Sequence, residues 1–238
     1  MKKHNCNRRN YVVILTIIAA LLVLSGCADL CGKGASRSGQ IELFNGKNFD
    51  GWYTVLKTKG VNKDPEGIFK VEDGLIHILG KEFGYLCTKK EYENYRLVVE
   101  FKWGEKKFAP RLNAKRDSGI LYHFPADKRD EVWPYCIECQ VQEGDCGDFY
   151  LVGPAITANG QRFTKKYYRI RKTANAERPS GQWNTMEVIA DGSKCTHIVN
   201  GVVVNEATDA SVHKGKILLQ SEGAEVYYRK VTLIPLRR

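Results

Sequence analysis

Apolar and polar residues alternate with a period of two along much of this chain, and no long segment shows the 3.6-residue periodicity of an amphipathic helix. The clearest case is the segment 95–103, where large apolar residues occupy every odd position and mostly charged residues occupy the even ones. Successive side chains of a strand point to opposite faces, so this pattern predicts a long strand with one buried face.

Glycine turns divide the alternating segments into many short strands. Asp73-Gly74 and Asn200-Gly201 each lie between apolar alternating residues and predict two-residue hairpins, and Asp191-Gly192 marks a further turn. Many short strands separated by such turns predict an all-β sandwich or barrel. The segment 155–182 is the least regular, and we expect it to form loops near the functional edge of the domain.

The N-terminus has the order of a secretory signal. Residues 1–10 are basic without any acid, residues 11–24 are almost wholly apolar, and the sequence Leu-Ser-Gly-Cys ends at Cys27. This apolar run is shorter than the roughly 20 residues that a membrane-spanning helix needs. Leu24 to Cys27 resembles the lipobox of bacterial lipoproteins, which implies a signal peptide at 1–26 and a lipidated Cys27. An uncleaved anchor with a chance cysteine is the alternative.

These features predict an exported protein that is attached to a bacterial membrane through its N-terminal lipid, on the periplasmic side or at the cell surface. Residues 27–40 are small, polar and rich in glycine, so we expect a flexible tether there. The single β-sandwich domain, catalytic or glycan-binding, is predicted to occupy 41–238.

Charge and cysteine content add weaker constraints. The formal net charge is +10, of which the signal carries four, and the remaining excess of six is scattered among acids, so we expect no nucleic-acid partner. Of the eight cysteines, Cys6 would leave with the signal. An oxidising compartment permits disulfides among the cysteines that follow Cys27, but their pairing is open and we interpret them mostly as small buried residues.

The segment 135–142 reads Tyr-Cys-Ile-Glu-Cys-Gln-Val-Gln and separates two kinds of side chain. If it is a strand, its apolar side chains face the core, and Glu138, Gln140 and Gln142 share the opposite face. A carboxylate and two amides supply both hydrogen-bond donors and acceptors at fixed spacing, which suits the hydroxyl groups of a sugar. The alternative is an ordinary solvated face.

Three neighbouring features favour the sugar-binding interpretation. Trp133 could stack on a sugar ring or belong to the core. His123 ends a short segment, 117–123, and its imidazole titrates near neutrality, although a lone histidine is more often structural. The acidic, glycine-rich segment 143–150 could bring Asp148 and Tyr150 over the same face, or could be a simple turn or a structural calcium loop.

An ordered series of motifs resembles one known family. It comprises the opening segment 43–52 (LFNGKNFDGW), Ser118-Gly119-Ile120, the Glu138 strand, the segment 181–184 (GQWN), the Asn200-Gly201 hairpin and the ending from 218 to 236. The series is similar to the 3-keto-disaccharide hydrolase-like proteins, a family of exported lipoproteins. The resemblance covers about 41–236 and implies a concanavalin A-like (laminin G-like) jelly-roll β-sandwich. The chain departs from the family in having His123 where a basic residue is common, and in lacking a histidine near Glu222.

The resemblance also implies a carbohydrate-active enzyme, a hydrolase or lyase that cleaves glycosidic bonds of 3-keto-glycosides. A base would abstract the C2 proton next to the ketone, the aglycone would be eliminated, and water would then add. We predict Glu138 or His123 as the base, and the other residue would assist the return of a proton to the leaving group. Gln140 and Gln142 would hold hydroxyls or the enolate, and Asp148, Trp133 and Tyr150 would shape the pocket. A divalent metal ion held by His123 and Glu138 is a further possibility.

Two other functions stay open at this point. A conventional glycoside hydrolase needs a second acid roughly 5–9.5 Å from Glu138, for which Glu100, Asp148 and Glu222 are candidates. A non-catalytic glycan-binding module at the cell surface would need only the fold and the polar row.

Overall fold

The computed structural model describes residues 39–237. The predicted signal peptide, the lipidation site Cys27 and nearly all of the predicted tether lie outside these residues. Within the described part of the chain, no helix is present that could cross a membrane.

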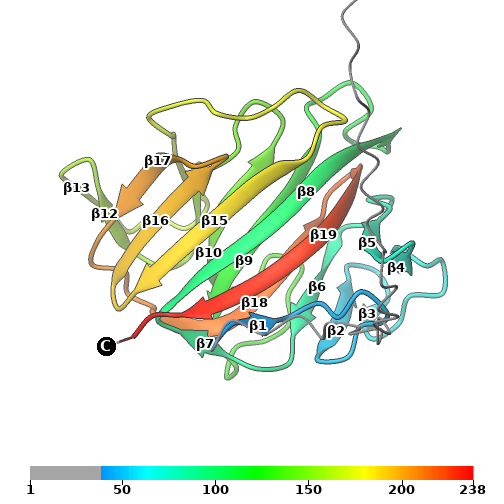
Figure 1. Ribbon diagram of the computed structural model, residues 1–238, viewed down its shortest axis with the longest axis horizontal. Coiled ribbons are helices and arrows are strands. Elements are labelled where there is room, and N and C mark those ends of the chain that lie inside the picture. The colour runs from blue at the N-terminus through cyan, green and yellow to red at the C-terminus, as the bar shows by residue number, and fades with distance from the viewer. Residues whose placement is uncertain (1–38, 238) are drawn as a thin grey trace, which may run out of the picture. The chain divides into compact units, whose positions relative to one another are not determined.

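The strands form two antiparallel sheets that pack face to face (Figure 1). The eight-stranded sheet has the order β17-β16-β15-β8-β19-β5-β4, and β1 pairs with β19. Its strands are β17 (Val202–Ala207), β16 (Lys194–Val199), β15 (Asn184–Asp191), β8 (Tyr95–Lys107), β19 (Ala224–Pro235), β5 (Leu75–Ile78), β4 (Phe69–Glu72) and β1 (Ile41–Glu42).

The nine-stranded sheet carries the candidate site. Its order is β14-β11-β10-β9-β18-β6-β2-β3, and β7 pairs with β18. Its strands are β14 (Tyr168–Ile170), β11 (Phe149–Val152), β10 (Cys136–Gln142), β9 (Asp117–Phe124), β18 (Lys214–Ser221), β6 (Gly84–Thr88), β2 (Trp52–Leu56), β3 (Gly60–Val61) and β7 (Tyr92–Glu93). A separate hairpin joins β12 (Ile156–Ala158) to β13 (Gln161–Phe163).

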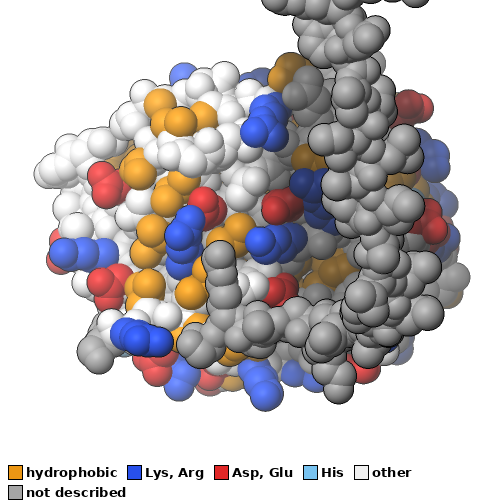
Figure 2. Space-filling view, in the orientation of Figure 1, with side chains coloured by type: hydrophobic (Ala, Val, Ile, Leu, Met, Phe, Trp, Pro, Cys, Tyr) orange, Lys and Arg blue, Asp and Glu red, His pale blue; other side chains and the backbone are white. Residues whose placement is uncertain are grey.

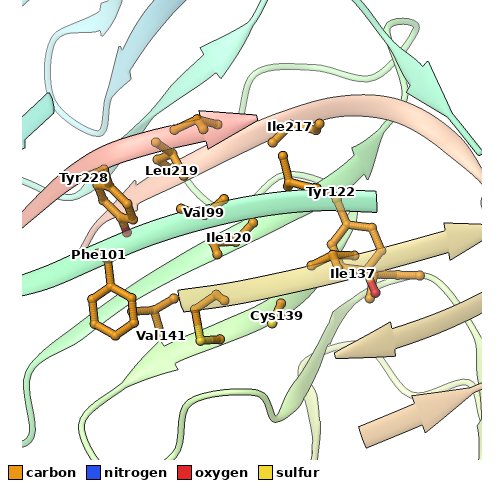
Figure 3. Close-up of a cluster of buried hydrophobic side chains, with 14 of the residues drawn as sticks. Val99, Phe101, Ile120, Tyr122, Ile137, Cys139, Val141, Ile217, Leu219 and Tyr228 are labelled. Atoms are coloured by element: carbon orange, nitrogen blue, oxygen red, sulfur yellow. The ribbon is translucent and has the colours of Figure 1, made fainter. Parts of the chain in front are cut away.

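The main hydrophobic core fills the space between the two sheets (Figure 3). Val99, Phe101 and Tyr228 enter it from the eight-stranded sheet, and residues of β9, β10 and β18 enter it from the other sheet. The odd positions of 95–103 are fully or almost fully buried, as the alternation predicts. The all-β sandwich is thereby confirmed.

Two predicted hairpins have the expected backbone geometry. Asp73 and Gly74 have φ values of 51° and 75° between β4 and β5, and Asn200 and Gly201 have φ values of 48° and 83° between β16 and β17. Two consecutive positive φ values define a type I′ turn, whose twist matches that of the flanking strands. Asn and Asp tolerate this conformation better than other non-glycine residues, which is why the sequence indicates these turns.

Charges of both signs are interspersed with apolar side chains on the visible face of the eight-stranded sheet (Figure 2). Ion pairs link neighbouring strands of this sheet, including Arg229–Glu100 and Arg96–Glu187. Five cysteines of the described region are free and buried, as we expected of small core residues: Cys87, Cys136, Cys139, Cys146 and Cys195.

Candidate active site

A pocket of about 300 Å³ lies on the outer face of the nine-stranded sheet, the face opposite the main core. Strands β9, β10, β11, β14 and β18 supply most of its lining, and five connecting segments supply the rest. The lining residues are Phe83, Arg111, Asp117, Trp133, Glu138, Gln140, Gln142, Tyr150, Val152, Tyr167, Arg169, Gln220 and Glu222.

The alternation along β10 places the predicted polar row in this pocket. Ile137, Cys139 and Val141 are completely buried in the main core, while Glu138, Gln140 and Gln142 point the other way and line the pocket. Glu138 is only 4% exposed, because the neighbouring strands and the pocket walls enclose it. The inferred separation of the two faces around Glu138 therefore holds in the structure.

Strand register brings further polar side chains beside this row. Gln142 is paired with Asp117 of β9, and Gln140 is paired with Gly119. Both amides of β10 donate to the same carboxylate, Gln140 Nε2 to Asp117 Oδ1 at 2.9 Å and Gln142 Nε2 to Asp117 Oδ2 at 2.6 Å. Asp117 is thus held rigidly by two donors from the neighbouring strand.

Asp117, Glu138 and Glu222 form a carboxyl cluster around a single guanidinium group. Arg111 makes ion pairs with both Asp117 and Glu222. Burial, together with the charges of Asp117 and Glu222, raises the pKa of Glu138 well above its usual value, and Arg111 opposes the shift. Burial also raises the pKa of Asp117 and of Glu222. One cation cannot neutralise three carboxylates, so burial favours partial protonation of the cluster.

Gly119 makes room for the Glu138 carboxyl group. A Cβ atom at position 119 would overlap with Glu138 Oε1 and would lie 2.9 Å from both Glu138 Cδ and Leu121 Cδ1. Glycine at this position therefore lets the carboxyl group lie flat over the backbone of β9, inside the pocket and away from bulk water.

Three residues that line the pocket each carry a buried oxygen with no hydrogen-bond donor within the described protein: Glu138 Oε1, Gln140 Oε1 and Gln220 Oε1. Buried polar atoms are rarely left unpaired, since each unsatisfied group costs about 1–3 kcal/mol. Three such acceptors in one pocket call for a ligand or solvent that offers several hydroxyl donors.

Aromatic side chains form the walls above this polar floor. Trp133 packs against Phe83 with ring centroids 5.8 Å apart, and Tyr150 and Tyr167 also line the pocket. The segment that carries Trp133 is anchored by Asp130, which accepts hydrogen bonds from Tyr53 Oη at 2.7 Å and from Tyr85 Oη at 3.1 Å. Trp133 also contacts a smaller apolar cluster on this outer face, so it is both packed and exposed to the pocket.

Asp148 supports the pocket from behind rather than lining it. It is 1% exposed, accepts a hydrogen bond from Arg169 Nε and accepts another from the backbone N–H of Lys172 at 2.8 Å. Arg169 lines the pocket and also pairs with Asp145 at 2.8 Å. The acidic segment 143–150 therefore positions Arg169, and the prediction that Asp148 shapes the pocket holds only through that arginine.

The structure does not bring His123 to the pocket, which corrects its predicted pairing with Glu138. Simple alternation from Leu121 would turn His123 toward the outer face. Instead His123 has a φ of 59°, and the β9–β18 register shifts between Lys216 and Leu218. This bulge turns the ring inward, where it packs against Tyr95 of the opposite sheet with a centroid distance of 5.9 Å.

The environment of His123 is that of a structural histidine. The ring is fully buried, Nδ1 donates to Val212 O at 3.2 Å, and burial lowers its pKa to about 4. His123 and Glu138 face opposite sides of the sheet, so they cannot act as a base–acid pair on one substrate. For the same reason they do not form the predicted pair of metal ligands, and no group of three His, Cys, Asp or Glu suited to a metal ion occurs in residues 39–237.

Several pocket residues were not predicted. Arg111, Tyr167 and Phe83 come from connecting segments, Arg169 and Gln220 come from strands far from β10 in sequence, and Asp117 was not recognised as an acid of the site. Of the three candidates for a second acid, Glu222 lines the pocket, Asp148 lies behind it, and Glu100 pairs with Arg229 on the other sheet.

The raised pKa of Glu138 makes a prediction about stability. The folded state holds the Glu138 proton more tightly than the unfolded chain, whose glutamates ionise near pH 4.3. The free energy of unfolding of the wild type should therefore fall as pH rises above about 4, and E138Q should lack this part of the fall. We expect E138Q to gain stability relative to the wild type between pH 4 and pH 7.

Urea unfolding at both pH values measures this difference. A constant difference in the free energy of unfolding across the range would contradict it.

The fold and pocket together define a class: a concanavalin A-like jelly-roll β-sandwich with an acidic, aromatic-walled pocket on one sheet. The sequence of residues 39–234 matches the 3-keto-alpha-glucoside-1,2-lyase-like domain, and the chain belongs to this family. The predicted family resemblance is thereby confirmed. No curated protein is significantly similar to the chain in sequence.

Three solved structures with the same fold share at most 23% sequence identity with this chain. One is a presumed glycosyl hydrolase from Parabacteroides distasonis ATCC 8503, with 23% identity and a TM-score of 0.60. The alignment covers 84% of this chain and 94% of the hydrolase chain. Another is a Bacillus subtilis protein of unknown function with a galectin-like fold, with 12% identity, a TM-score of 0.55 and coverages of 84% and 96%. A third is the Bacillus licheniformis β-glucanase, with 12% identity, a TM-score of 0.52 and coverages of 85% and 100%.

Proposed function

We propose that this protein cleaves glycosidic bonds of 3-keto-glycosides at the Glu138 pocket, by abstraction of the C2 proton, elimination of the aglycone and hydration. Membership of the 3-keto-alpha-glucoside-1,2-lyase-like family supports the substrate class. The observation that carries the proposal is the buried Glu138 carboxyl group, with one oxygen unpaired, at the floor of a pocket that holds two more unpaired amide oxygens.

The chemistry needs a base and a stabiliser of negative charge. A ketone at C3 acidifies the C2–H bond, and a carboxylate takes that proton while the electron pair enters the enolate. The enolate then expels the glycosidic oxygen from C1, which leaves an enone and the free aglycone after protonation. Water adds to C1 of the enone and a proton returns to C2, so the net reaction is hydrolysis.

Glu138 suits the role of the base. Burial raises its pKa, and a carboxylate of raised pKa is a stronger base than one in water. Its Oε1 atom accepts no hydrogen bond from the described protein, so no protein donor lowers the basicity of this oxygen. Gly119 leaves space for the carboxyl group and offers it no donor side chain.

The remaining pocket groups suit binding and charge stabilisation. Arg111 is the cation beside the cluster and can stabilise the enolate oxygen of the transition state. The free amide oxygens of Gln140 and Gln220 accept hydrogen bonds from sugar hydroxyls. Trp133 and Tyr150 provide apolar ring surface for the C–H face of the sugar.

A substrate panel tests the proposal. The purified domain is incubated with 4-nitrophenyl 3-keto-glucoside and with the same glucoside lacking the ketone, and release of nitrophenol is followed. We expect turnover of the 3-keto substrate alone, because only the ketone makes the C2 proton acidic. When the reaction is run in D2O, the product should carry deuterium at C2. Turnover of the 3-keto substrate without deuterium at C2 would contradict proton abstraction.

A conventional glycoside hydrolase is the second candidate, because Glu138 and Glu222 line one pocket and could act as a carboxyl pair. Efficient cleavage of the plain glucoside would establish it. Turnover of neither glucoside, with measurable binding of both, would identify the domain as a glycan-binding module.

We also propose, from the sequence, that the domain acts outside the cytoplasm while attached to a membrane through lipid on Cys27. The basic, apolar and Cys27-terminated order of the first 27 residues supports this.

A further inference from the structure

The turn between β18 and β19 carries Glu222 into the pocket beside Arg111. Gly223 follows with a φ of 78°, and a Cβ atom there would lie 2.6 Å from Arg111 Cγ. Glycine therefore allows the arginine side chain to cross the turn closely enough to reach both Glu222 and Asp117. The two carboxyl groups and the guanidinium form one unit at the pocket wall.

The two carboxyl groups of this unit are not equivalent. Asp117 accepts from Gln140, Gln142 and Arg111, its oxygens are both engaged, and its side chain is 2% exposed. Glu222 contacts only Arg111 among the hydrogen bonds and ion pairs found in residues 39–237, through Oε1, and its side chain is 15% exposed. Glu222 therefore has a second oxygen that is free to meet a ligand.

One guanidinium neutralises one of the two carboxylates. An ionised Asp117 satisfies all three of its side-chain donors, whereas a protonated Asp117 would place a hydrogen against one of them. The proton that the pair retains therefore belongs on Glu222. Burial raises the pKa of Glu222, which favours its protonated form, and Arg111 opposes the shift.

We propose that Glu222 is the general acid of the reaction, donating its proton to the glycosidic oxygen as the C1–O bond breaks, with Asp117 and Arg111 as its positioning residues. This inference rests on the proposed function of the Glu138 pocket and assigns the proton-donor role that His123 does not fill.

The proton balance closes over the two half-reactions. Glu138 takes the C2 proton, the enolate electrons form the C1–C2 double bond, the C1–O electron pair moves to the leaving oxygen, and the Glu222 proton joins that oxygen. Water then adds to C1 of the enone while the Glu222 carboxylate takes a water proton. The proton on Glu138 exchanges with solvent between the half-reactions, Glu138 then delivers a proton to C2, and both carboxyl groups regain their starting states.

Leaving groups of different basicity test this role. Nitrophenolate leaves without protonation, whereas methoxide needs a proton. For E222Q we expect kcat with a methyl 3-keto-glucoside to fall at least about 100-fold and kcat with a 4-nitrophenyl 3-keto-glucoside to fall less than about 10-fold. The pH profile of the methyl substrate should lose its alkaline limb. The amide oxygen that this substitution introduces can still accept from Arg111, so KM should change little.

E100Q is the matched control, since Glu100 pairs with Arg229 on the other sheet and both variants lose one carboxylate that is bonded to an arginine. Equal losses with both substrates in E222Q, or no loss with either, would overturn the assignment. A wild type that turns over neither 3-keto substrate would refute the proposed function instead. If E222Q does not fold, the wild-type enzyme is assayed with a series of 3-keto-glucosides whose leaving groups differ in pKa. A weak dependence of kcat on leaving-group pKa supports a general acid, and a strong dependence overturns the assignment.

Discussion

E138Q is expected to lower kcat for a 3-keto-glucoside by about 1,000-fold while leaving the fold intact. General base catalysis contributes typically 10²–10⁴-fold, and the pocket offers no second unpaired carboxylate in the same position. Glutamine has nearly the same shape, so it fits over Gly119 and removes only the ability to accept a proton. Stopped-flow or steady-state assays with the 4-nitrophenyl substrate measure the loss directly.

The matched control again is E100Q, which should retain wild-type kcat because Glu100 lies on the other sheet. Binding of the product sugar to E138Q, measured by calorimetry, should stay within a few fold of the wild-type value. A wild-type kcat for E138Q would refute the assignment of the base. If kcat is unchanged but sugar binding is lost, Glu138 is a substrate-binding residue.

G119A is expected to reduce both stability and activity. The added methyl group would overlap with Glu138 Oε1 and crowd Leu121, which requires the Glu138 carboxyl group to move. Overpacking a closely packed site costs about 1–3 kcal/mol, and displacement of a reacting group by about 1 Å can lower kcat about 100-fold. Thermal unfolding and steady-state kinetics of the same preparation measure the two effects.

The double variant G119A/E138A separates crowding from other effects of alanine. Removing the Glu138 side chain takes away the atoms that the new methyl group would meet, so the double variant should cost less than the sum of the single changes in the free energy of unfolding. Additive costs would show that position 119 does not act through Glu138. Full activity of G119A would show that the Glu138 carboxyl group needs no support from β9.

The polar row of the site could be predicted because β10 is a regular strand. With a period of two, the apolar residues at 137, 139 and 141 fix the direction of Glu138, Gln140 and Gln142 without any knowledge of the rest of the fold. The type I′ hairpins at 73–74 and 200–201 were predictable for a similar local reason, since short polar residues followed by glycine favour positive φ values.

The role of His123 could not be predicted by the same rule. The β-bulge next to it depends on how β18 pairs with β9, and these strands lie about 90 residues apart in sequence. Arg111 and Glu222 likewise meet only because a turn and a connecting segment converge in the folded chain. The part of the site that local periodicity specifies was accessible from sequence, and the part built by long-range contacts was not.

The attachment of the Trp133 segment has a consequence for how such pockets diversify. Its anchor is Asp130, held by two tyrosine hydroxyls of β2 and β6, whereas the acids and amides lie on β9, β10 and β18 and in the turn after β18. The aromatic wall that Trp133 contributes is therefore held independently of the proton-transfer groups. Exchanges between positions 125 and 135 can therefore change the surface on which the sugar ring stacks while the proton-transfer groups keep their positions.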